Sequence, residues 1–373
     1  MRPCGRCVFP ALAALAMLPA GLAHAQFLQD GAGLAMSVML DSNPGLSPTG
    51  AEAVWRFMLT PDYRLSRVNG ADSLNARAAV QVERSSDPSL SAGRESPSLS
   101  LGWRRETPTG EFGLSAKYEK SPTRTSELLD TGRVAADAAR QSAEASANWR
   151  TALDERNSLA LAGALRSVSY QGGGDFTDYR ELSGSATFTH GWDERTEPYA
   201  RYAVSRYAPD GGGPSSDSHS VEAGLKRAFS ELLSGEAHAG IRRNGGQAVS
   251  GWQGGVALNY AGRRSNWSWG AARTASASGA GAFVESDQAN MSWTHALSET
   301  SRAGIDLLWR RNRSNDAPGE VRQFTAWAGR ELDEFWNLRL SYQYKEVGRG
   351  PTDASAHVLG LTLMYSHPDL PDL

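Results

Sequence analysis

The chain has 373 residues and carries 41 acidic and 38 basic side chains, which gives a net charge of −3 at pH 7. Because the two signs are interspersed, the sequence has no clustered basic face of the kind that binds nucleic acid. Its mean hydropathy is −0.45, and no stretch after Gln26 approaches the roughly 18 apolar residues that a membrane-spanning helix needs. We therefore expect neither a nucleic-acid partner nor a helical membrane anchor.

The first 25 residues have the pattern of a secretory signal peptide. An apolar run, Val8 to Leu22, follows a short positive start and leads into Ala23-His24-Ala25, a small-x-small cleavage site. We expect the mature chain to begin at Gln26. The two cysteines, Cys4 and Cys7, would leave with this segment, so the mature protein is expected to have no disulfide and no thiolate chemistry.

From residue 26 onward, apolar and polar residues alternate with a period of two. In 73–84, for example, Leu74 and Val80 share one face, while Asn75 and Gln81 share the other. Each such run covers about 10 to 12 residues, which is the length a tilted strand needs to cross a bilayer, whereas strands of soluble sandwiches are nearer to 5 or 6. The pattern predicts an all-β protein, a single transmembrane antiparallel up-and-down β-barrel.

We expect about 18 strands in this barrel, with 16 as the alternative count. The expected spans are 33–41, 53–65, 73–84, 96–106, 110–120, 139–152, 157–170, 179–192, 196–207, 218–229, 234–243, 250–261, 265–275, 286–297, 301–312, 321–331, 336–347 and 354–365. Near Gly163 the alternation changes phase, and a β-bulge there would account for the change.

The connections between these strands alternate in length. Short connections, such as 107–109 and 193–195, alternate with long ones, such as 42–52 and 121–138. Outer-membrane barrels have short periplasmic turns and longer outer loops. We therefore expect both termini in the periplasm, and the longest connection, 121–138, outside the cell.

Aromatic residues recur next to the short connections, at the same end of alternate strands. Their spacing of roughly 30 to 46 residues corresponds to one hairpin each, and this phase predicts an aromatic girdle at the periplasmic membrane face. The expected girdle includes Trp103, Trp149, Trp192, Phe229, Tyr260, Trp293, Trp327 and Tyr365. A sparser aromatic set is expected at the other end: Tyr118, Tyr170, Tyr207, Trp309 and Tyr344.

Charged residues on the polar face of the strands are the candidates for lining the lumen. They are Arg77, Arg104, Lys117, Glu119, Arg150, Asp306, Arg310, Arg339 and Lys345. Such charges can create a transverse field that favours polar or charged solutes, or they can serve only as pairs between neighbouring strands. Because both signs are represented, we expect no strong ion selectivity.

The sequence contains no strong catalytic or metal-binding motif. The histidines after residue 26 are isolated, HExxH is absent, and no group of Cys or His has the spacing of metal ligands. We therefore expect no cofactor, no metal and no enzymatic activity. An outer-membrane enzyme stays as a minor alternative, because the site residues of barrel enzymes converge only in three dimensions.

Residues 36–44, Met-Ser-Val-Met-Leu-Asp-Ser-Asn-Pro, together with Ser47-Pro48, resemble the β-barrel porin 2 family. Members of that family are outer-membrane proteins often encoded beside exopolysaccharide and PEP-CTERM loci. The resemblance implies a barrel tied to the export or passage of a polymer or its fragments, and it transfers no site residue. The chain departs from the family at its end: such barrels tend to finish on an aromatic residue, whereas Ser366 to Leu373 follow Tyr365.

The expected organisation is a signal peptide over 1–25, one outer-membrane barrel over 26–365 without a plug, and a short periplasmic tail over 366–373. Barrels of 16 to 18 strands enclose an aqueous lumen. The leading interpretation is porin-like passage of hydrophilic solutes or saccharides across the cell outer membrane, with a link to exopolysaccharide export. The alternative is a non-conducting barrel that anchors or assembles surface polysaccharide. Outer-membrane lipid, the barrel assembly machinery and polysaccharide are the expected partners.

Overall fold

The computed structural model describes six stretches of the chain, namely 26–130, 138–172, 176–245, 251–313, 319–349 and 352–367. The expected signal peptide, 1–25, lies outside these stretches. Most of the expected tail, 368–373, also lies outside them.

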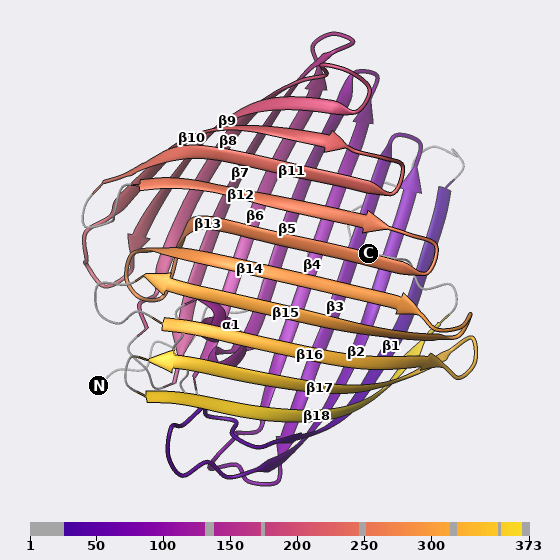
Figure 1. Ribbon diagram of the computed structural model, residues 1–373, viewed down its shortest axis with the longest axis vertical. Coiled ribbons are helices and arrows are strands. Elements are labelled where there is room, and N and C mark those ends of the chain that lie inside the picture. Colours follow the sequence, from indigo (N-terminus) through magenta and orange to yellow (C-terminus); the bar gives the residue numbers. More distant parts are fainter. Residues whose placement is uncertain are drawn as a thin grey trace.

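The described residues form a closed antiparallel barrel of 18 strands (Figure 1). Every strand pairs with its neighbours in the sequence, and β1 pairs with both β2 and β18, which closes the sheet. The strands are β1 (Gln26–Asp41), β2 (Val54–Asn69), β3 (Asp72–Ser85), β4 (Arg94–Thr107), β5 (Gly110–Pro122), β6 (Ala139–Ala152), β7 (Asn157–Gln171), β8 (Tyr179–His190), β9 (Thr196–Pro209), β10 (Ser216–Ala228), β11 (Leu233–Asn244), β12 (Gly251–Ala261), β13 (Ser265–Ala277), β14 (Phe283–Ala296), β15 (Ser301–Arg313), β16 (Gly319–Glu331), β17 (Trp336–Arg349) and β18 (Thr352–Ser366). The up-and-down barrel and the count of 18 are confirmed.

The alternation of the sequence becomes an alternation between the outside and the lumen of the barrel. On β2, the side chains of Trp55, Phe57 and Leu59 are 48%, 50% and 43% exposed, whereas Arg56 between them is 7% exposed. Large apolar side chains left in water would each cost about 1.5–3 kcal/mol relative to burial. A continuous outer band of this kind is therefore suited to lipid, which is the arrangement of membrane-spanning barrels.

The two ends of the barrel differ in their connections. At one end short turns are closed by carboxylate caps: Oδ1 of Asp154 accepts hydrogen bonds from the backbone N–H groups of Arg156 and Asn157, each at 2.8 Å. β1 begins at this end, where Gln26 pairs with Asn69. β18 finishes there too, with the backbone N–H of Ser366 donating to Phe335 at 2.9 Å. Both ends of the sheet therefore lie at the short-turn end.

The bulge expected near Gly163 is absent from the described pairs of β7. Gly163 pairs with Ala147 on one side and Gly184 on the other, and the register continues on both sides without an offset. The change of phase has a different origin. Val168 is only 1% exposed and packs in a buried cluster with Tyr179 and Tyr207, so this apolar residue occupies a position of the inward face.

Candidate functional site

The long connection between β5 and β6 folds into the barrel. Its first part forms α1 (Thr123–Asp130), which lies among the strands in Figure 1. Leu128 is only 3% exposed and belongs to a buried cluster with Val321, Val347 and Ala356 of β16, β17 and β18. These strands stand across the barrel from β5 and β6. α1 therefore gains its packing by folding into the lumen instead of projecting from the barrel, and the placement of this connection on the outer side of the membrane stays a prediction.

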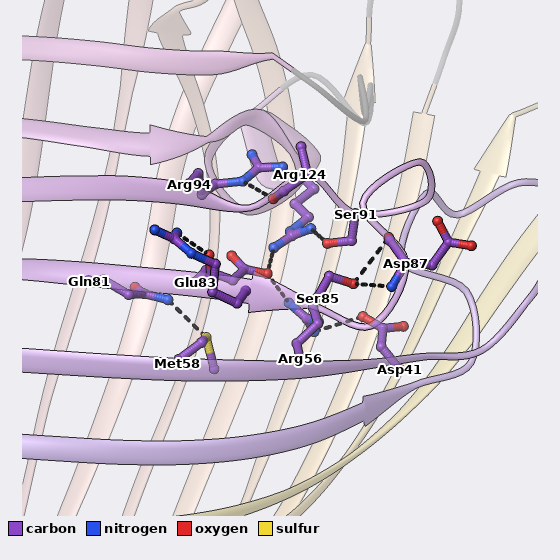
Figure 2. A network of polar contacts seen from close by, with 12 residues as sticks. Asp41, Arg56, Met58, Gln81, Glu83, Ser85, Asp87, Ser91, Arg94 and Arg124 are labelled. Carbon is purple, nitrogen blue, oxygen red and sulfur yellow. Dashed lines mark hydrogen bonds and ion pairs between the residues drawn. The ribbon is translucent and has the colours of Figure 1, made fainter.

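A polar network fastens the start of α1 to β3 (Figure 2). The guanidinium of Arg124 contacts Glu83 and donates to Oγ of Ser91 at 2.5 Å. Glu83 also faces Arg56 at 3.7 Å, and Arg56 in turn pairs with Asp41 at 2.7 Å. Burial lowers the pKa of the Arg124 guanidinium, and the nearby Arg56 adds to this effect. Removing one partner from such a buried pair destabilises the fold, because it leaves an uncompensated charge.

A second polar contact holds the middle of α1. The hydroxyl of Tyr170 donates to Oε1 of Glu127 at 2.8 Å, and Nε of Arg140 lies 3.6 Å from the same oxygen. The ring of Tyr170 stacks on Phe176 with a centroid distance of 4.9 Å. Tyr170 therefore faces the lumen, and the expectation that it belongs to an outer aromatic set is wrong. Tyr207, which is fully buried, is a second error of the same kind.

The connection between β13 and β14, residues 278–282, also folds inward. The backbone N–H of Thr177 donates to the carbonyl of Gly279 at 2.8 Å, and the Tyr207 hydroxyl donates to the carbonyl of Ser278 at 3.4 Å. A side chain on Gly279 would collide with the Tyr170 ring, so only glycine allows this approach. Tyr170 thus touches both inward segments, which together narrow the long-loop mouth of the barrel.

Beneath α1 lies a cavity of about 740 Å³ along the arc of wall that runs from β16 through β18 and β1 to β5. Its basic lining residues are Arg56, Arg77, Lys117, Lys120, Arg124, Arg339 and Lys345, and its acidic ones are Glu83 and Glu119. Two further carboxylates, Asp41 and Asp62, pair with Arg56 and Arg77, so seven cations stand against four carboxylates in this sector. The even balance of charge that the sequence suggested does not hold here, because inward carboxylates such as Glu181 and Glu222 line a different cavity, which extends from β6 to β14.

Six of the nine predicted lumen residues line two cavities next to α1. Arg77, Lys117, Glu119, Arg339 and Lys345 line the cavity beneath α1. Arg310 shares a second cavity of about 400 Å³ with Lys117 and Glu119, beside α1, so it reaches from β15 toward the opposite wall.

The remaining three predicted lumen residues lie away from these two cavities. Nε of Arg104 lies 3.5 Å from a carboxylate oxygen of Glu111. Arg150 lines a pocket among the short turns. Asp306 accepts a hydrogen bond from Ser292 at 2.6 Å. The structure therefore brings together most, but not all, of the candidates.

The expected girdle residues mostly lie on the outer face near the short turns. Trp149, Trp192, Phe229 and Tyr260 are each exposed. The other three pack against aromatic neighbours: Trp103 against Phe112, Trp293 against Trp267, and Tyr365 against Phe335 and Trp336. For these seven residues a membrane girdle stays a prediction.

Trp327 is the exception, because it faces the lumen. It pairs with Ser341, which lines the cavity beneath α1, and the guanidinium of Arg339 lies 4.2 Å from the centre of its ring. The prediction that Trp327 belongs to the girdle is therefore wrong. The alternation could have revealed this, since Gln323 and Thr325 stand on the same face as Trp327 and both are polar.

No group of His, Cys, Asp or Glu suited to holding a metal ion occurs in the described stretches. Within the same stretches, none of the helices is long and apolar enough to cross a membrane.

No protein-family model and no curated protein sequence matches the chain. Solved structures do. The outer membrane protein opdK from Pseudomonas aeruginosa matches with a TM-score of 0.52 at 10% identity, over 91% of this chain and 98% of that one. OpdK with vanillate matches with a TM-score of 0.53 at 9% identity and the same coverage. OccAB2 from Acinetobacter baumannii matches with a TM-score of 0.50 at 8% identity, again over 91% and 98%. At these identities the likeness concerns the fold.

The closed barrel of 18 strands, with its outer apolar band, defines the class of protein. Only a closed barrel lets β-strands cross lipid with every backbone group paired. The chain is a β-barrel of the bacterial outer membrane.

Proposed function

We propose that the barrel allows small hydrophilic solutes to pass through its lumen in the manner of a porin, with α1 setting the narrowest section. The single observation that carries this proposal is the polar cavity of about 740 Å³ beneath α1. It lies between α1 and the inner face of the barrel, and hydroxyl, amide and charged side chains such as Ser98, Gln81 and Arg77 line it. Such a lining replaces part of the hydration shell of a polar solute.

The excess of cations in this cavity favours anions over cations. Opposite charges inside a low-dielectric wall attract more strongly than in bulk water, and rings of Arg and Lys select anions in pores. The proposal therefore replaces the unselective pore expected from the sequence with one that prefers anionic solutes.

Swelling of liposomes that contain the purified barrel tests the passage of solutes. Arabinose, a monosaccharide, should enter quickly and raffinose, a trisaccharide, much more slowly, because α1 spans the lumen. Equal rates for the two sugars would contradict a constriction at α1. Absence of swelling with arabinose, from barrel shown to be folded, would contradict passage itself.

A link to exopolysaccharide is a finer proposal, and its support is the resemblance of residues 36–44 to the β-barrel porin 2 family. The corresponding alternative function is a non-conducting barrel that serves the assembly of surface polysaccharide. The observation that favours this alternative is the inward folding of both α1 and residues 278–282 at one mouth. Deletion of the gene and complementation with a non-conducting variant would distinguish the two functions. Loss of surface polysaccharide on deletion and its return with the non-conducting variant would support the alternative.

A further inference from the structure

The cations around the cavity beneath α1 differ in how their charges are balanced. Arg56 pairs with Asp41, and Arg124 contacts Glu83. Among the described residues, no carboxylate lies within ion-pair distance of either of the two cations on β17, Arg339 and Lys345, although both line the cavity. Asp306 attracts Arg339 and Asp41 attracts Lys345 only from beyond that distance, so both cations keep charge that a solute can meet.

Arg339 is held in a fixed orientation by an aromatic ring. The carbon at the centre of its guanidinium lies 4.2 Å from the ring centroid of Trp327, a distance at which a cation is attracted to the face of an indole. The indole is itself held against β15, because it lies over Gly304, where any side chain would collide with the ring. Gly304, Trp327 and Arg339 thus form a layered stack across β15, β16 and β17.

This arrangement leaves the edge of the guanidinium free. A guanidinium that stacks through its face still presents its N–H groups in its own plane, where they match the two oxygens of a carboxylate or phosphate. The neighbouring wall offers Ser341, Thr325 and Gln343, which line the same cavity and can bond hydroxyl groups in either direction. Arg77 on β3 lines the same cavity and is paired with Asp62 at 3.5 Å.

We propose that Arg339, held on Trp327, is the anion-binding subsite of the lumen, and that it binds the carboxylate or phosphate of a small hydroxylated solute, a sugar acid or a sugar phosphate. Lys345 lies six residues further along β17 in the direction of the long-loop mouth, which is roughly 20 Å along the strand at the usual rise per residue. It meets the anion first, at α1. This inference rests on the proposed passage of solutes and names the chemical class that the lumen prefers.

Equilibrium binding to the purified full-length barrel in detergent tests the subsite without requiring conduction. Titration calorimetry with glucose 6-phosphate and with gluconate should show binding, whereas neutral glucose should bind much more weakly. Arg339→Gln should weaken glucose 6-phosphate binding about tenfold or more, because it removes a charge-assisted hydrogen-bonding partner. Arg339→Lys should restore part of the affinity. Trp327→Leu, which keeps the cation but removes its support, should also weaken binding.

Arg104→Gln is the matched control, because it removes a lumen arginine that is paired with Glu111 near the short turns; it should leave binding unchanged. No binding of either anion to wild type, or equal binding to wild type and Arg339→Gln, overturns the subsite. The proposed function is judged separately by arabinose entry into liposomes. Arginine-dependent binding without entry would leave the subsite standing and refute passage, and entry without such binding would do the reverse.

Discussion

Replacing Leu128 with alanine should release α1 from the far wall without unfolding the barrel. Leu128 is 3% exposed and packs with Val321, Val347 and Ala356. A buried Leu→Ala change costs about 2–5 kcal/mol, from lost transfer energy and the cavity left behind. A loss of about 3 kcal/mol changes the ratio of docked to undocked α1 by about 100-fold. The strand pairing does not involve this side chain, so the barrel itself should persist.

Liposome swelling with raffinose, normalised to arabinose, measures this change. The ratio should rise clearly in Leu128→Ala, since an undocked α1 no longer spans the lumen. Leu361→Ala is the matched control: it removes the same atoms from a side chain that is 48% exposed on the outer face, and its ratio should equal that of wild type. An unchanged raffinose rate in folded Leu128→Ala would refute the reasoning that α1 forms the constriction.

Three further predictions concern the wall, the closing strand and the turns. Val80→Arg should cost roughly 2–4 kcal/mol of folding free energy in lipid vesicles if Val80 sits near the midplane, whereas Gln81→Arg, on the lumen face, should cost much less; equal costs would show that the faces are reversed. Tyr365→Ala should lower the amount of heat-modifiable barrel in the outer membrane, because the ring packs on Phe335 and Trp336, while deletion of 366–373 should not. Hydrogen bonds from the Asn157 side chain and from the backbone N–H groups of Arg156 and Asn157 lower the pKa of Asp154 below its usual 3.8. Its stabilising contribution is therefore complete above that value and lost as the pH falls through the lowered pKa, so urea unfolding of Asp154→Asn should depend less on pH below about 4 than that of wild type.

Most of the barrel could be predicted from the sequence because its strands obey a local rule. A residue on the outer face must be apolar and its neighbour need not be, so the period of two survives in almost every strand. β6 was expected over 139–152 and is observed over Ala139–Ala152. β1 begins earlier than expected, at Gln26 instead of residue 33, because its first residues pair with the end of β2.

The inward segments could not be predicted, because their packing depends on residues far away in the sequence. Nothing local to Leu128 shows that it will meet Val321 and Val347, and nothing near Gly279 shows that it will lie against Tyr170. The same contacts explain the misassigned aromatic residues: Tyr170 and Tyr207 are apolar enough for lipid, but Tyr207 is buried and Tyr170 is partly buried against the inward segments. Trp327 is different, since its polar neighbours two and four residues earlier already placed it on the lumen face.

The candidate site also combines features that the sequence could predict with features that it could not. The sequence identified Arg77, Lys117, Arg339 and Lys345 as lumen residues, because charge on the polar face of a membrane strand has nowhere else to lie. It could not show which of these cations would have a carboxylate partner, as Arg77 has in Asp62, and which would not. This difference in pairing depends on the order of the strands around the barrel and on where α1 crosses the lumen.

Single-channel recording of the purified wild-type barrel in planar bilayers, with a salt gradient across the membrane, tests the central claim most directly. A lumen narrowed by α1 and lined by surplus cations should give discrete conductance steps, and the reversal potential should have the sign of a pore that prefers chloride over potassium. Folded barrel that inserts without any conductance steps, or a reversal potential that shows preference for potassium, would contradict the account.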